Sequence, residues 1–327
     1  MKLIKTINGL QKEKPIWIMR QAGRYLPEYK ELRKKSKSFM EFCLNKEMVL
    51  EATLQPIERF DFDAAIIFSD ILVIPHFLGQ KVWFEEGVGP VLAKPNWSEI
   101  LSNKLSDGIS VVYDSIKSVR KNLQKDKALI GFAGCPWTLG SYMISCGKTL
   151  DFENLVDFSK DWQKFDQLIE SLIQAISVHC ISQLLAGANA VQLFESWAFA
   201  VPVEYRQKWL FEPAQKIVKN IRKEIPEAII IYYGRGVSKD AITALDHLGI
   251  AFGISEDIDL FELPETKSCL QGNLDPKKLR DGDFKAEVLK TIEFAENRPF
   301  IFNLGHGILP DTPLSHVEAF MKMLRNG

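Results

Sequence analysis

Two arginines four residues apart, Arg20 and Arg24, are the first residues whose type and spacing suggest a shared ligand. A guanidinium group binds a carboxylate or a phosphate through two parallel hydrogen bonds. If the chain turns helically after Arg20, both groups face the same side, and Gly23 between them would permit a tight turn. The alternative, which spacing alone favours, is two surface arginines without a common ligand.

Two further polar residues follow apolar runs. Asp70 is either a hydrogen-bonded structural group or an active-site carboxylate. An aspartate beside two arginines would normally pair with them, and if it does not, it is available for a cationic or N–H-rich ligand. His306 lies between Gly305 and Gly307, and such glycines let a ligand approach the backbone closely. Its alternative is a turn histidine in solvent.

Other catalytic motifs lack support in the sequence. The loop Gly234–Lys239 has two glycines before a helix but lacks the spacing of a dinucleotide or phosphate loop, so a nucleotide site there is weakly indicated. No H-E-x-x-H, EF-hand, G-x-S-x-G or kinase motif occurs. The five cysteines are scattered without a C-x-x-C pair, which suits reduced, buried thiols in a cytosol. Neither metal nor nucleotide chemistry is therefore expected.

The overall charge does not point to a polyanionic partner. Lys and Arg number 41 against 42 Asp and Glu, so nothing indicates nucleic acid or an anionic membrane. An anionic ligand must then be met by local positive charge. The apolar stretches AAIIF and AIIIYY are too short to span a bilayer, and the N-terminus lacks the apolar core of a signal peptide. We expect a soluble, cytoplasmic protein.

The elements that must position these residues alternate along the chain. Expected strands are 15–20, 64–68, 128–133, 190–195, 228–233, 251–254, 269–272 and 299–304. Their continuous apolar character is typical of parallel strands buried on both faces. Expected helices are 46–60, 107–124, 155–186, 203–224, 239–248, 284–296 and 315–325. Pro202 and Pro226 bracket one of these helices, and Gly249 follows another.

Eight strands alternating with helices predict an α/β fold, either a (β/α)8 TIM barrel or a doubly wound open sheet. The count of eight favours the barrel, as a single domain over 1–327 with a β-hairpin inserted at 79–94. Barrel enzymes place their chemistry at the carboxyl ends of the strands. Arg20, Asp70, Ser196 and His306 follow such ends, and Tyr142 lies just beyond another.

Two long segments resemble a known family. PIWIMRQAGRYLPEY (15–29) and GFAGCPWTLGSYM (131–143) closely resemble the two signatures of uroporphyrinogen decarboxylases. FSDIL (68–72), QLFESWA (192–198), LQGNLDP (270–276) and FNLGHGILPDTP (302–313) are also similar to family segments and fall in the expected order. The resemblance thus covers nearly the whole chain.

This resemblance implies a (β/α)8 barrel, usually a homodimer with facing clefts, that converts uroporphyrinogen III into coproporphyrinogen III. Four ring acetates become methyl groups without a metal or an organic cofactor. The family's substrate-binding positions correspond to Arg20, Gln21, Ala22, Gly23, Arg24, Asp70, Tyr142, Ser196 and His306, with Phe132 and Phe194 as apolar walls. Asp70, Arg20 and Tyr142 are the residues expected to be catalytic.

The chemistry explains this choice of residues. Loss of carbon dioxide leaves an electron pair, and a pyrrole protonated beside the acetate can accept it without a cofactor. Asp70 can accept the pyrrole N–H groups and stabilise the developing cation, while the arginines and His306 hold carboxylates. Arg20, a protonated Asp70 and a carboxylate-bound water all remain candidates for the proton donor.

Two other functions fit parts of this pattern. A zinc-dependent corrinoid or thiol methyltransferase shares the barrel superfamily and binds zinc through histidine and cysteine. This chain has no H-x-C motif, and His306 has no cysteine nearby in sequence. A non-catalytic tetrapyrrole carrier with a decayed site is the other alternative, and the full set of site residues argues against it.

Overall fold

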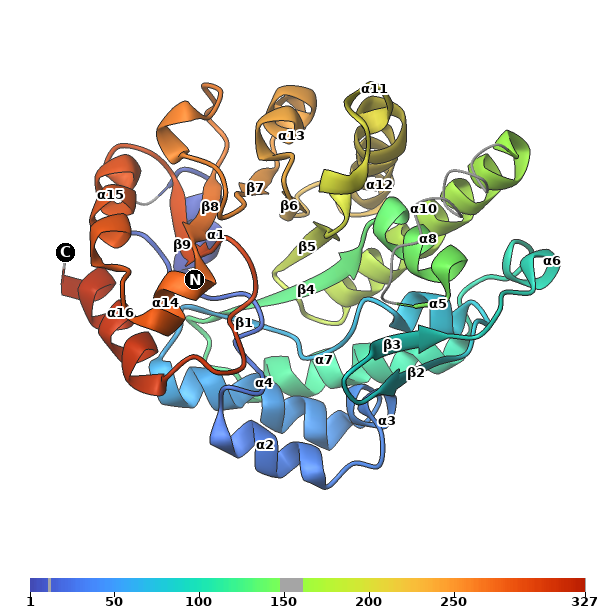
Figure 1. Cartoon of the computed structure of the whole chain (residues 1–327), viewed down its shortest axis with the longest axis horizontal. Coiled ribbons are helices and arrows are strands. Elements are labelled where there is room, and N and C mark those ends of the chain that lie inside the picture. The colour runs from blue at the N-terminus through green and yellow to red at the C-terminus, as the bar shows by residue number, and fades with distance from the viewer. Residues whose placement is uncertain (11–12, 148–160, 327) are drawn as a thin grey trace.

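A parallel sheet curls into a barrel with helices on its outer side (Figure 1). The structure is a computed structural model that describes residues 1–10, 13–147 and 161–326. The sheet order is β1 (Ala64–Ile66), β4 (Ala128–Gly134), β5 (Ala190–Glu195), β6 (Ile230–Gly234), β7 (Ala251–Gly253), β8 (Leu270–Leu274) and β9 (Phe300–Leu304). These seven strands match seven of the eight expected runs, and all neighbours pair in parallel.

The eighth place is taken by an irregular segment, residues 15–19. Ile16 forms one isolated parallel bridge to Phe302 of β9, and the Trp17 amide donates to the Phe302 carbonyl at 3.2 Å. On the other side, the Asp63 amide donates to the Ile16 carbonyl at 2.8 Å, just before β1. The segment therefore lies between β9 and β1 and closes the barrel, so the predicted fold is confirmed.

Side chains replace a regular ladder in this segment, which is why the expected strand 15–20 is not a strand. The Ile16 amide donates to Asp63 Oδ2 at 2.9 Å, and the Met19 amide donates to Asn303 Oδ1 at 2.9 Å. Arg20 then leaves the extended region altogether, with φ of 62°. The sequence pattern shows an apolar run but does not reveal that side chains will take its hydrogen bonds.

The barrel interior is filled rather than open, as in other barrels of this type. Inward side chains include Trp17, Ile66, Ile130, Ile231 and Ile301, with Leu3 of the N-terminal helix packed among them. Buried amides join this layer by hydrogen bonds: Trp17 Nε1 donates to Gln271 Oε1 at 2.9 Å, and Gln271 Nε2 donates to Gln192 Oε1 at 3.1 Å.

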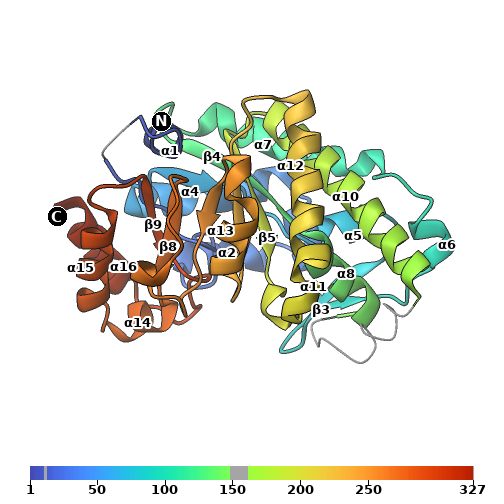
Figure 2. The same cartoon turned by 90° about the horizontal axis from the view of Figure 1, so that it is seen from above.

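Helices surround the strands, and Figure 2 shows α10 beside α12 on the outer layer. The described α-helices are α1 (Lys2–Ile7), α2 (Pro27–Lys34), α3 (Phe39–Cys43), α4 (Lys46–Phe60), α5 (Val73–Phe77), α6 (Trp97–Ile100), α7 (Ser110–Asn122), α8 (Pro136–Ser145), α10 (Trp162–Leu185), α11 (Val203–Arg206), α12 (Glu212–Glu224), α13 (Ser238–Leu245), α14 (Pro276–Asp281), α15 (Lys285–Ala295) and α16 (Leu314–Asn326). Short 3-10 turns are η1 (Asp107–Ile109), η2 (Ala198–Ala200), η4 (Asp246–Leu248) and η5 (Leu260–Glu262), and η3 (Gln207–Phe211) is a π-helix.

The helix expected over 155–186 is α10 in the described part, and residues 155–160 lie outside the described residues. By length and composition, Gln163–Leu185 could cross a membrane, a property that the short apolar runs of the sequence did not indicate. However, 56% of its apolar window is buried, and α10 packs on α12, α8 and β4. Such packing is that of a core helix.

A β-hairpin lies within 79–94, as expected from the sequence. Its strands β2 (Val82–Glu85) and β3 (Gly89–Leu92) pair antiparallel, with Val82 opposite Leu92. The hairpin lies beside α3, outside the ring of parallel strands (Figure 1). It therefore adds to the barrel without interrupting the sheet.

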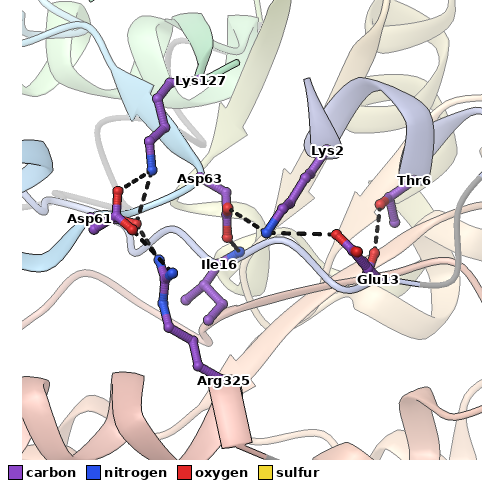
Figure 3. A network of polar contacts seen from close by, with 8 residues as sticks. All are labelled: Lys2, Thr6, Glu13, Ile16, Asp61, Asp63, Lys127 and Arg325. Atoms are coloured by element: carbon purple, nitrogen blue, oxygen red, sulfur yellow. Dashed lines mark hydrogen bonds and ion pairs between the residues drawn. The ribbon is translucent and has the colours of Figure 1, made fainter. Parts of the chain in front are cut away.

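Charged side chains tie the amino ends of the strands to both ends of the chain (Figure 3). Lys127, directly before β4, has a side chain only 6% exposed and forms an ion pair with Asp61. Arg325 of α16 pairs with the same carboxylate at 3.1 Å. Lys2 of α1 approaches Asp63 at 3.5 Å. This network fixes α1 and α16 at the amino end of the barrel.

Candidate functional site

The predicted site residues follow the carboxyl ends of the strands and so share one end of the barrel. Arg20 and Arg24 are exposed, whereas Ala22, Gly23, Asp70, Phe132, Tyr142, Phe194, Ser196 and His306 are half-buried. Gln21 alone among them is fully buried. The carboxyl end of the barrel is thus where candidate groups with contrasting charge come together.

Asp70, after β1, is held by the backbone and not by an arginine. Its Oδ1 accepts a hydrogen bond from the Leu72 amide at 2.8 Å. Within the described ranges, no ion pair joins Asp70 to Arg20 or Arg24. Burial raises the pKa of Asp70, and the Leu72 hydrogen bond and the Arg20 charge oppose that rise. The carboxylate can therefore accept further hydrogen bonds.

Tyr142 lies on α8 within electrostatic range of the same two groups. Burial raises its pKa, Asp70 raises it further, and Arg20 lowers it. The Tyr142 ring lies against Trp197, with ring centroids 6.0 Å apart at an angle of 64°. Asp70, Arg20 and Tyr142, the residues expected to be catalytic, are thus close enough to influence one another.

Glu195, which ends β5 and was not singled out as a site residue, fixes the start of α8. Its Oε1 accepts hydrogen bonds from the Thr138 amide at 2.7 Å and from the Thr138 hydroxyl. The Trp197 amide in turn donates to Thr138 Oγ1 at 3.3 Å. These bonds join the loop that carries Ser196 to the helix that carries Tyr142.

Glu195 is fully buried, and its Oε2 atom has no hydrogen-bond partner among the described residues. Burial raises the pKa of Glu195 to about 8, against the opposing hydrogen bonds from Thr138 and Trp137. The sequence signal that could have found this residue is a lone charge at the end of an apolar run, AVQLFE.

His306 follows β9, but its flanking glycines serve chain packing. A side chain at Gly305 would collide with the Glu256 backbone, and one at Gly307 would collide with the Arg20 side chain. The expectation that these glycines admit a ligand to the backbone is therefore wrong, because other parts of the protein occupy that space. They bring the loops after β7 and β9 together and place Arg20 against His306.

Burial, followed by the charges of Arg20 and Arg235, lowers the pKa of His306 to about 4. The imidazole is therefore neutral near pH 7. A neutral imidazole still carries one N–H donor, so His306 can bind a carboxylate through a hydrogen bond instead of through a full charge.

The segment after Arg20 does not turn helically, because α2 begins only at Pro27. The helical argument for Arg20 and Arg24 therefore fails. Gln21 faces the core, where its Oε1 accepts from the Ile18 amide at 3.3 Å and its Nε2 donates to the Ala64 carbonyl at 3.2 Å. The charge of Arg20 lowers the pKa values of Asp70, Tyr142 and His306. The charge of Arg24 instead lowers the pKa of Tyr29, against a larger rise caused by burial.

Three aromatic rings lie at the carboxyl end of the barrel interior. Phe132 of β4 and Phe194 of β5 lie edge to face with centroids 5.8 Å apart, and Phe194 lies 5.9 Å from Tyr233 of β6. Tyr233 donates a hydrogen bond to the Gly305 carbonyl at 2.7 Å. These half-buried phenylalanines thus lie at the carboxyl end of the barrel and offer an apolar surface there.

In the part of the chain that the structure describes, no group of three or more His, Cys, Asp or Glu side chains could hold a metal ion. The five cysteines are free thiols, and only Cys146 is not fully buried.

The family model described as uroporphyrinogen decarboxylase (URO-D) matches residues 2–327. A uroporphyrinogen decarboxylase from Chelativorans sp. (strain BNC1) is 40% identical over 336 residues, which cover 100% of this chain and 98% of the relative. One from Rickettsia bellii (strain RML369-C) is 42% identical, over 98% of this chain and 96% of the relative. One from Orientia tsutsugamushi (strain Ikeda) is 39% identical, over 99% and 98%.

Solved structures agree with the fold. A methyltransferase from Methanosarcina mazei superposes with a TM-score of 0.78 at 17% identity, over 99% of this chain and 97% of that chain. A B12-independent methionine synthase from Shewanella sp. W3-18-1 gives a TM-score of 0.54 at 12% identity, over 97% of both chains. At these identities the likeness shows the fold alone.

Proposed function

Because the chain belongs to the uroporphyrinogen decarboxylase family, we propose that it converts uroporphyrinogen III into coproporphyrinogen III by decarboxylating the four acetate side chains. The reaction belongs to haem and tetrapyrrole synthesis. The observation that supports it most directly is Asp70, a half-buried carboxylate that has a backbone N–H partner but no ion pair with the nearby arginines among the described residues. Its remaining lone pairs are free for pyrrole N–H groups.

The protein is nearly neutral overall, with a formal net charge of −1, so its total charge does not attract an anionic substrate. Arg20 and Arg24, both exposed, supply local positive charge for an octacarboxylate. His306 is neutral near pH 7 and contributes an N–H donor. Phe132 and Phe194 offer an apolar surface to the macrocycle.

Each decarboxylation adds two protons and releases one, so it consumes one proton in total and needs no oxidant. A proton first adds to the ring carbon next to the one that bears the acetate, which places positive charge on the pyrrole nitrogen and on the acetate-bearing carbon. The bond from the acetate methylene to its carboxylate then breaks, carbon dioxide leaves, and the ring accepts the electron pair. A second proton converts the methylene carbon into a methyl group, while the proton on the ring carbon is lost.

Asp70 can stabilise the cationic stage because it lies near the pyrrole nitrogens when it accepts their N–H groups. A hydrogen bond to a charged group contributes about 1.5–3 kcal/mol, so several such bonds would orient the macrocycle firmly. Preorganised charge of this kind is usually the largest catalytic contribution. Tyr142, whose pKa burial raises, remains a phenol and can donate a hydrogen bond beside Asp70.

Three groups could deliver the first proton: Arg20, a protonated Asp70, or a water bound by a substrate carboxylate. Burial raises the pKa of Asp70, which favours its protonated form. Arg20 opposes that rise and is a weak acid in water.

The finer assignments follow from the family resemblance. The proposed enzyme works without a metal or organic cofactor, in the cytoplasm, as a homodimer with facing sites. It has no nucleic-acid or membrane partner, which its balanced count of 41 basic and 42 acidic residues supports. Light scattering of the purified protein tests the dimer directly, and a concentration-independent monomer would contradict it.

Anaerobic incubation with uroporphyrinogen III tests the proposed activity. Separation of the products by carboxylate number should give intermediates and finally the tetracarboxylate, because each acetate is lost in turn. The type I isomer, incubated in parallel, measures the isomer preference. Unchanged octacarboxylate after prolonged incubation of folded enzyme would contradict the proposal.

A further inference from the structure

A third arginine, outside the residues that the family resemblance assigns, lies at the same end of the barrel as Arg20 and Arg24. Arg235 directly follows β6, and its Nη2 lies 3.5 Å from Oε1 of Glu256, which follows β7. The two side chains are 38% and 21% exposed. They therefore form a partly desolvated ion pair beside the site described above.

The backbone that carries Arg235 is held by hydrogen bonds on both sides. The Arg235 amide donates to the Glu195 carbonyl at 3.2 Å, and the Gly236 amide donates to Ser255 Oγ at 2.9 Å. Gly236 has φ of 71°, and a side chain there would collide with Phe199. A glycine is thus required for the approach of Phe199, and the turn that directs Arg235 is fixed.

The Arg235 guanidinium lies over the Phe199 ring, 5.6 Å from its centroid. Such a contact holds the planar cation in one orientation without using its N–H groups. Across the described residues, the Arg235 side chain makes no hydrogen bond beyond its ion pair with Glu256. Most of its five donors are therefore available to a ligand.

The positive charges of Arg235 and Arg20 both influence His306. After burial, their charges are the causes that lower the pKa of His306. Arg20 follows segment 15–19 and Arg235 follows β6, which lie on different sides of the barrel. Two guanidinium groups on different sides of the barrel therefore place positive charge around His306, which suits a ligand with several carboxylates.

Glu256 is an imperfect partner for Arg235. Its Oε2 is buried and has no hydrogen-bond partner among the described residues. Burial raises the pKa of Glu256, which shows that the site disfavours its charge. A carboxylate that meets the guanidinium through two parallel hydrogen bonds would be better paired than Glu256 is.

We propose that Arg235 binds a side-chain carboxylate of the tetrapyrrole, and that Glu256 competes for the same guanidinium until the substrate replaces it. The inference rests on the proposed function and adds a binding residue and its competitor to that site. Arg235 contacts a carboxylate at the edge of the macrocycle and not the reacting carbon, so its contribution is equal in ground and transition states.

Substitutions of Arg235 and of Glu256 should therefore change KM in opposite directions under anaerobic turnover. Arg235→Gln should raise KM about tenfold with kcat within about twofold, because a charge-assisted hydrogen bond is lost from binding. Arg235→Lys, which keeps the charge but not the planar fork, should give an intermediate KM. Glu256→Gln should lower KM about two- to fivefold because the competing charge is gone.

A double variant tests whether Glu256 acts through Arg235. In the Arg235→Gln background, Glu256→Gln should leave KM unchanged, because no guanidinium remains to compete for. A fall in KM of the same size in both backgrounds would overturn the competition.

The ion pair between Lys239 and Glu262, 2.8 Å apart, is the matched control, since it links the same two connections, after β6 and after β7, in a more exposed place. Lys239→Gln and Glu262→Gln should leave KM unchanged. An inactive wild-type enzyme would overturn the proposed function and this inference with it. An active wild type whose KM is unaltered by Arg235→Gln would overturn the inference alone.

Discussion

A carboxylate near two arginines would ordinarily pair with them, and the freedom of Asp70 from such a pair is what makes it useful. Its Oδ1 accepts the Leu72 amide, which fixes the side chain while leaving the second oxygen free of any protein hydrogen bond among the described residues. Arg20 is near enough to affect its pKa but lies against Gly307. In the proposed binding mode, the negative and positive groups of the site are therefore available to different parts of one ligand.

Asp70→Asn should fold normally and lose most of its turnover. Asparagine keeps the size of the side chain and an oxygen for the Leu72 amide, so the melting temperature should change little. The lost charge no longer stabilises the ring cation, and kcat should fall about a hundredfold or more. Product analysis by carboxylate number measures kcat, with the exposed Asp114→Asn as control. Near-normal turnover would remove Asp70 from the mechanism.

Single residues show where sequence reasoning stops. Asp70 and His306 could be found because each follows an apolar run, and the barrel places such residues at one end. The burial of Gln21 and the packing of Gly305 could not be found in this way. In both cases the decisive neighbour, Ala64 or Glu256, is far away in sequence and becomes adjacent only when the barrel closes.

At the scale of elements, hydrophobic runs predicted the barrel strands well, and β5 has the expected bounds 190–195. The helix expected over 203–224 is interrupted, because α11 passes through the π-helix Gln207–Phe211 before α12. Pro213 has no N–H to donate to the Trp209 carbonyl four residues earlier, so the chain widens there. Apolar periodicity continues through such a turn and hides it.

Glu195 should make the stability of the wild-type protein fall as the pH rises. Burial raises its folded-state pKa to about 8 from an ordinary value of 4.5. A raised pKa favours the protonated form, so this stability is fully present below about pH 4.5 and is lost as the pH rises through 8. Glu195→Gln should lack this slope, and the largest difference between the two proteins is roughly 5 kcal/mol.

Urea unfolding between about pH 5 and pH 9 measures this effect as the difference between wild type and Glu195→Gln. Asp70 and His306 titrate in both proteins, so the difference isolates Glu195. Exposed Glu204→Gln is the control and should run parallel to wild type. Parallel curves for Glu195→Gln would mean that the hydrogen bonds to α8 cancel the cost of burial.

At the scale of the whole molecule, the two ends of the barrel differ in their use of charge. At the carboxyl end, Arg20 and Asp70 form no ion pair with each other among the described residues, and Arg235 has only the 3.5 Å pair with Glu256, which leaves these groups available for the proposed ligand. At the amino end, Lys127 and Arg325 meet on Asp61 and fix the last helix to the starts of β1 and β4 (Figure 3). In a barrel, function is expected at the first end and stability at the second.

Lys127→Met should therefore reduce stability without reducing activity. Methionine keeps the buried stem, but the Asp61 carbonyl and carboxylate lose a buried donor, for which about 1–3 kcal/mol of unfolding free energy is expected. Lys117→Met removes an exposed pair with Asp114 and should change stability by less than about 1 kcal/mol. For both variants kcat and KM should equal those of wild type at temperatures well below unfolding. If Lys127→Met lowered kcat in fully folded protein, the amino end would have to influence the site through the strands, and the separation of the two ends would be wrong.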